Sequence, residues 1–122
     1  MSWKDAINQG REIVLATSSD DKPHAIMVIS LGMVDGKLLI GACQMKTSLK
    51  NILKNRKVCI VAKYKKEYYR IKGTAEVYSS GKYFNIAVKR SKPPLPRRAV
   101  VIDIKEAFDL DRAKRIKALR QK

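Results

Sequence analysis

Residues 39–52 read LIGACQMKTSLKNI, and this stretch passes from an apolar strand through a short loop into the start of a helix. The strand is expected over residues 37–42, where apolar and β-branched residues follow a turn signal. A helix is expected over residues 47–56, because its apolar residues recur at helical spacing and Thr47 or Ser48 can cap it. The stretch therefore predicts a strand–loop–helix unit.

The start of this helix is a candidate phosphate site. The first turn of a helix presents N–H groups without intrahelical partners and a partial positive charge, and both favour a phosphate. Lys46 adds a full charge, and Thr47 and Ser48 add hydroxyl donors. A capped surface helix with solvated lysines is the alternative interpretation of the same residues.

The rest of the chain divides into short strands that turn signals separate. Asp35-Gly36 is a strong hairpin signal, Gly73 indicates a bulge inside its strand, and the prolines of residues 91–96 exclude regular structure there. Because most connections are too short for crossover helices, six strands predict a six-stranded antiparallel barrel, mainly β with short helices. The further strands are expected at residues 12–18, 24–31, 58–64, 68–78 and 99–104, and short helices at residues 2–9 and 82–89.

Composition limits the class of protein. The chain has 122 residues, which fits a single domain over residues 1–122, and 45% of them are hydrophobic, which is enough for a core. The formal net charge of +16 attracts anions such as nucleic acid, acidic membrane surfaces or phosphorylated small molecules. No stretch is long and apolar enough to span a bilayer, and the N-terminus lacks the pattern of a secretory signal. A cytoplasmic protein without membrane association is expected.

The sequence contains few residues that could form a metal site or a nucleophilic catalytic site. His24 is the only histidine, and Cys43 and Cys59 are the only cysteines, so no metal-ligand spacing is present. The sequence offers no serine–histidine–aspartate arrangement either. No metal site and no catalytic residue is therefore predicted.

Four pieces of the chain, taken in order, resemble a known family. They are residues 13–18 (IVLATS), 22–24 (KPH), 46–58 (KTSLKNILKNRKV) and 69–77 (YRIKGTAEV). This series is similar to the FMN-binding split barrels of the pyridoxamine 5′-phosphate oxidase-like superfamily, over roughly residues 12 to 110. The resemblance implies a split β-barrel that binds FMN at the interface of a homodimer.

The resemblance also implies a set of cofactor-binding residues. The phosphate would be held by Lys46, Thr47, Ser48 and Asn51. Tyr68 would reach the FMN of the second subunit. The ribityl chain and the ring would lie along two strands, against Met27, Val28, Ile29 and Ser30 on one and Ile40, Gly41, Ala42 and Cys43 on the other.

Several departures restrict what the resemblance carries over. Ala25 stands where many oxidases have an arginine, and Arg56 replaces the usual proline. A basic tail over residues 111–122, expected to be helical, replaces the long C-terminal segment that grips pyridoxine phosphate. We therefore expect FMN but not a vitamin B6 substrate, and relatives with a similar core use a deazaflavin or haem instead. The resulting hypothesis is an FMN-dependent oxidoreductase or electron carrier whose substrate and electron donor are unassigned.

Two other hypotheses stay open from the sequence. A nucleic-acid-binding small β-barrel without catalytic activity is suggested by the net charge, the basic tail, residues 89–92 and the tyrosines that could stack on bases. Such binding would fall steeply with salt. The other hypothesis is a flavin barrel that has lost its site and is retained as a dimeric scaffold.

Overall fold

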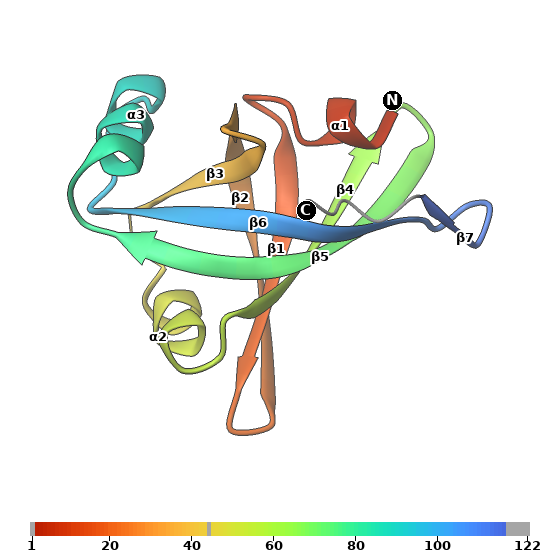
Figure 1. Ribbon diagram of the computed structural model, residues 1–122, viewed down its shortest axis with the longest axis horizontal. Helices are drawn as coiled ribbons and strands as arrows, with labels where there is room; N and C mark the ends of the chain where they lie inside the picture. Colours follow the sequence, from red (N-terminus) through yellow and green to blue (C-terminus); the bar gives the residue numbers. More distant parts are fainter. Residues whose placement is uncertain (1, 44, 117–122) are drawn as a thin grey trace.

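The computed structural model describes residues 2–43 and 45–116, and in this part of the chain one antiparallel sheet curls around a core with three short helices (Figure 1). The helices are α1 (Ser2–Ala6), α2 (Lys46–Lys54) and α3 (Lys82–Arg90). The strands are β1 (Glu12–Ser19), β2 (Lys22–Val34), β3 (Lys37–Ala42), β4 (Lys57–Tyr64), β5 (Glu67–Tyr78), β6 (Arg98–Asp109) and β7 (Lys114–Ile116).

The sheet closes into a barrel. Its strand order is β3-β2-β1-β4-β5-β6-β7, and β3 also pairs with β6. That extra pairing, with Leu38 opposite Ile102 and Gly41 opposite Ala99, joins the ends of a six-stranded antiparallel barrel. β7 lies outside the barrel against the far end of β6. The predicted fold class is confirmed.

The alternation of apolar residues fills the barrel. Ile13, Leu15, Ile60 and Ile71 point inward and are at most 1% exposed. Trp3 and Ala6 of α1, and Ile7 directly after it, are buried against the same core. α1 and α2 lie on opposite sides of the ribbon (Figure 1). α3 covers a second apolar cluster on the outside of β3 and β6, formed by Leu31, Leu39, Ala87, Ala99 and Val101.

Gly73 marks a bulge, as its position in the sequence predicts. The register between β5 and β6 shifts between Lys72 and Gly73. A Cβ atom at Gly73 would collide with the main-chain carbonyl of Asp103 on β6. Only glycine therefore allows the two backbones to approach this closely.

The tail departs from its prediction. Residues 111–116 form a turn and the short strand β7, so the helical prediction for residues 111–122 is wrong for this part, and residues 117–122 lie outside the described residues. β6 runs on to Asp109, beyond the predicted end at residue 104, and its free edge pairs with Ile116. The Asp109 carboxylate accepts the N–H groups of Asp111 and Arg112, which fixes the turn. No described helix is long and apolar enough to cross a membrane.

Candidate functional site

A groove of about 980 Å³ runs along β2. Residues 26–31 of β2 form its floor. Gly41, Cys43, Met45 and Thr47, from the end of β3 and the start of α2, contribute to one wall. The other wall comes from the end of α3 and the proline segment that follows it. Among the described lining residues there is no carboxylate, so the groove suits an uncharged or anionic ligand.

The floor of the groove is an unpaired strand edge. β3 pairs with β2 only from Ser30 to Val34, so the Lys22–Ile29 part of β2 has a strand neighbour on one side alone. The main chain of Ser30 donates to Arg11 and accepts from Gly10, on the β1 side. Because backbone groups alternate along a strand, those of Met27 and Ile29 point to the open edge. The groove therefore presents free main-chain donors and acceptors.

The start of α2 is open to an anion. Its N-cap residue is Met45, no side chain caps it, and its first turn holds no acidic residue. The prediction that Thr47 or Ser48 caps this helix is therefore wrong. The Ser48 side chain is buried, and its Oγ has no hydrogen-bond partner among the described residues. The amides of this first turn can donate to an anion, and the buried Ser48 hydroxyl belongs to the same turn.

Asn51 anchors α2 to β1. Its Nδ2 donates to Thr17 Oγ1 at 3.0 Å, and its Oδ1 accepts from Ser19 Oγ at 2.7 Å. One turn later, Asn55 Nδ2 donates to Ser18 Oγ at 3.3 Å. The hydroxyls at the end of β1 therefore set the position of the helix whose first turn faces the groove.

The structure brings together only some of the residues proposed from the sequence. Ile40 and Ala42 point into the barrel core, and Ser48 and Asn51 are buried at α2 outside the groove lining. Lys46 is exposed at the start of α2, and Tyr68 on β5 lies outside the groove of its own chain. Those that line the groove are Met27, Val28, Ile29, Ser30, Gly41, Cys43 and Thr47.

The sequence did not predict that the end of α3 and the proline segment form the second wall of the groove. Arg90 Nη1 donates to the carbonyls of Leu31 at 2.9 Å and Met33 at 3.4 Å, which fixes the end of α3 against β2. The Cys43 thiol approaches the carbonyl of Pro94 at 3.4 Å, across the mouth of the groove. The pairing of β3 with β6 brings the proline segment close to β3. No local sequence pattern predicts the contact of Cys43 with Pro94, because the two residues are 51 positions apart.

One row of side chains crosses five strands on the outside of the barrel. The register places Met27 of β2 beside Val14, Val14 beside Val61, Val61 beside Arg70, and Arg70 beside Phe108. Met27 is 62% exposed, although it is apolar. The Arg70 guanidinium lies 4.6 Å from the centre of the Phe108 ring, and its buried Nε has no hydrogen-bond partner in the part of the chain that the structure describes. We call these five residues the outer row.

Cys59 lies beside the outer row and is not an activated thiol. Burial raises its pKa, and the nearby charges of Arg70 and Lys72 only partly oppose this effect. A raised pKa keeps the thiol protonated and unreactive. No cluster of three or more histidine, cysteine or carboxylate side chains that could hold a metal ion occurs among residues 2–43 and 45–116.

Comparisons with known proteins agree with this geometry. The model of the pyridoxamine 5′-phosphate oxidase family matches residues 2–111. An uncharacterised protein of Methanocaldococcus jannaschii is 40% identical, over 80% of this chain and 72% of its own. The crystal structure of HupZ from Group A Streptococcus superposes with a TM-score of 0.82 at 23% identity, over 93% of this chain and 95% of its own. An F420 reductase superposes with a TM-score of 0.67 at 15% identity, over 85% of this chain and 94% of its own.

The two structural likenesses show a shared fold. The family match covers nearly all of the described residues, including the groove, α2 and the outer row. This chain belongs to the pyridoxamine 5′-phosphate oxidase family.

Proposed function

We propose that this chain is an FMN-binding flavoprotein that acts as an oxidoreductase or electron carrier. The observation that carries the proposal is the uncapped start of α2, where the buried Ser48 hydroxyl lacks a partner, next to a groove with an open strand edge. Substrate and electron donor are not part of the proposal.

The phosphate of FMN fits the first turn of α2. The N–H groups of this turn have no side-chain acceptor, and the Ser48 hydroxyl has none either. Lys46 and Thr47 are exposed at the same turn, so an ammonium and a second hydroxyl are available. A phosphate there gains charge-assisted hydrogen bonds and the favourable end of the helix dipole.

The flavin ring fits the groove. Its rim alternates hydrogen-bond donors and acceptors, as does the open edge of β2 at Met27 and Ile29. Its apolar faces suit a groove without carboxylates. When bound, FMN supplies the hydride or electron chemistry, while the chain holds the ring and shapes its surroundings.

A homodimer completes this proposal. Met27 and Ile29 line the groove and are 62% and 47% exposed, so a second copy against the outer row would cover them. An acceptor from that copy would also satisfy the buried Arg70 Nε. Tyr68 lies two residues before Arg70 on the same face of β5, where it can reach the groove of the second copy.

A spectrum and a titration test the function. The protein as isolated, or after incubation with FMN, should show the visible absorption of a bound flavin. Replacing Lys46 and Thr47 by alanine should weaken FMN binding at least tenfold, because each hydrogen bond to a charged group is worth roughly 1.5–3 kcal/mol. Lys54→Ala is the matched control, since Lys54 lies at the other end of α2 and pairs with Asp20 at 3.2 Å.

Two results would contradict the proposal. A protein that stays colourless and binds no FMN excludes the function. A protein that binds a deazaflavin in the same titration but not FMN reassigns the cofactor.

A further inference from the structure

Two long stretches of the chain contain no acidic residue. Residues 36–66 and 77–102 hold neither aspartate nor glutamate, although lysine and arginine recur in both. They supply β3, α2, α3 and the proline segment, which are the elements that wall the groove. These walls of the groove therefore carry cations and no carboxylate.

Five of these cations belong to the elements next to the loop that joins β3 to α2. The N–H of Arg97 donates to the carbonyl of Ala42 at 2.9 Å, and Arg98 pairs with Ala42 in the sheet. All five are exposed, and none forms an ion pair within the described part of the chain. We call this surface the groove-mouth patch; it consists of Lys46, Lys50, Lys92, Arg97 and Arg98.

A small ligand in the groove leaves most of this charge unused. Only Lys92 of the patch lines the groove, and Lys50, Arg97 and Arg98 lie outside it. A phosphate monoester carries at most about two negative charges, and the first turn of α2 already suits it. A second, larger anionic surface is needed to contact the remaining cations together.

The apolar residues within the patch favour a protein over a nucleic acid. Leu95, which lies between Lys92 and Arg97 in the chain, is 53% exposed, and Leu53 on α2 is 73% exposed. Protein interfaces combine an apolar centre with a charged rim. Surfaces that bind single-stranded nucleic acid instead present aromatic rings for stacking, whereas the nearby rings of Tyr78 and Tyr83 are half-buried and packed on each other at 5.3 Å.

We propose that the groove-mouth patch docks an acidic electron-transfer protein. This inference rests on the proposed function, because docking there brings the redox centre of the partner to the mouth of the flavin groove. A partner that delivers one electron per encounter must dock twice, and two protons from water complete the two-electron reduction of one bound FMN. Brief, charge-steered contacts suit such an interface, which typically buries less than about 1,200 Å².

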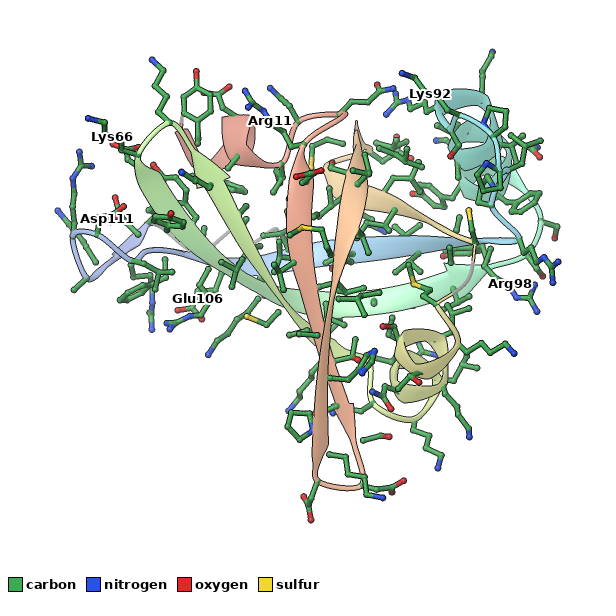
Figure 2. All side chains as sticks on the ribbon, turned by 180° about the vertical axis from the view of Figure 1, so that it is seen from behind. Arg11, Lys66, Lys92, Arg98, Glu106 and Asp111 are labelled. Atoms are coloured by element: carbon green, nitrogen blue, oxygen red, sulfur yellow. The ribbon has the colours of Figure 1, made fainter. Side chains whose placement is uncertain are left out.

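The experiment compares two triple variants of equal net charge. Lys50→Gln, Arg97→Gln and Arg98→Gln remove three charges from the patch. Lys4→Gln, Lys65→Gln and Lys66→Gln remove three from α1 and the β4–β5 turn. Of these, Lys66 lies far from Arg98 (Figure 2). Dissociation constants for an acidic [2Fe–2S] ferredoxin and an acidic flavodoxin are measured by fluorescence anisotropy at several salt concentrations, with and without FMN.

The patch variant should bind at least one probe about tenfold more weakly at low salt, and the control variant should bind as the natural chain does. Equal loss in both variants would show attraction by net charge alone and overturn the inference. Patch-dependent binding of a single-stranded oligonucleotide, with neither protein probe binding, would also overturn it. Failure of the flavin titration alone contradicts the proposed function, since docking is measured on the FMN-free chain as well.

Discussion

Ser48 and Asn51 lie one turn apart on α2 and differ in their hydrogen-bond partners. Both side chains are buried and polar. The Ser48 hydroxyl has no hydrogen-bond partner within residues 2–43 and 45–116, whereas the Asn51 amide is bonded to Thr17 and Ser19 on β1. Ser48 therefore suits ligand binding, and Asn51 suits positioning of the helix.

Ser48→Ala should weaken FMN binding without weakening the fold. No protein hydrogen bond is lost, and a buried polar group without a partner is removed, so the free energy of unfolding should stay equal or rise. Loss of one bond to the phosphate should raise the FMN dissociation constant roughly tenfold. Fluorescence titration with FMN and thermal melting separate the two effects. Unchanged FMN affinity would place the phosphate elsewhere.

Asn51→Ala should show the opposite order of effects. It removes two hydrogen bonds and leaves the buried Thr17 hydroxyl without its donor, which should lower the free energy of unfolding by about 2–3 kcal/mol. Urea unfolding of the FMN-free chain measures this directly. A variant as stable as the natural chain would show that Asn51 does not hold α2 in place.

The sequence identifies residue types better than it identifies their partners. Lys46, Thr47 and Ser48 could be proposed as phosphate ligands from the sequence because they lie together at a helix start. The resemblance also implies Asn51 as a phosphate ligand. Its partners in β1 give no local signal, because they are more than 30 residues away in the chain. Arg90 gives no local signal, since its position in the site depends on where α3 meets β2.

At the level of elements, the bulge at Gly73 fixes how β5 crosses β6. Gly73→Ala would push a methyl group against the carbonyl of Asp103, and a main-chain atom cannot move aside as a side chain can. The free energy of unfolding should fall by roughly 1–3 kcal/mol. Chemical denaturation checks this, with Lys72→Ala at the neighbouring exposed position as control. Equal stability of the two variants would contradict the close approach.

A second element contact, between α3 and the β2–β3 turn, should depend on pH. Asp35 Oδ2 accepts from Lys82 Nζ at 2.6 Å and from the Tyr83 hydroxyl at 3.0 Å, and these bonds lower the pKa of Asp35. A lowered pKa contributes stability above the ordinary aspartate pKa of about 4, and this is lost as pH falls through the folded value.

Asp35→Asn should therefore melt at a lower temperature than the natural chain at neutral pH, and the difference should vanish in acid. Thermal melts from neutral pH down to a pH below the lowered pKa of Asp35 test the prediction, with Asp21→Asn, in the β1–β2 turn, as control. A difference that persists below the lowered pKa would assign it to the turn rather than to the ion pair.

Element prediction succeeded where one strand or helix determines its own pattern. β1 and β4 alternate buried and half-buried residues over most of their length, which is visible in the sequence. Residues 111–116 carry apolar residues at helical spacing and yet form a turn and β7. Their structure is decided by the free edge of β6 and by Asp109, which lie outside the segment.

At the scale of the whole molecule, we expect the outer row to form the interface of a homodimer. Met27→Asp places a charge at the β2 end of the proposed interface, and the FMN-free chain should change from dimer to monomer because a buried, unpaired carboxylate is costly. Light scattering after size-exclusion chromatography measures the mass. Leu53→Asp, at an apolar position 73% exposed and off the row, should leave the dimer intact. A dimer that survives Met27→Asp would move the interface elsewhere.

The barrel could be predicted as a class from its short connections, but its closure could not. The pairing of β3 with β6 joins residues about 60 positions apart, such as Leu38 and Ile102. The groove depends on this closure, because it brings the proline segment opposite the start of α2. Its location is therefore a property of the assembled barrel rather than of any motif.

The bare side of β2 has a consequence for the life of this protein in a crowded cell. An exposed strand border can pair with a strand of another chain, and such pairing is a common start of aggregation. Lys22 and Pro23 oppose such pairing at one end of β2. The apolar residues 25–29 that follow contain neither a charge nor a proline that would oppose it. A flavin ring bound there would cover this border, so a shortage of FMN would leave the chain prone to aggregation.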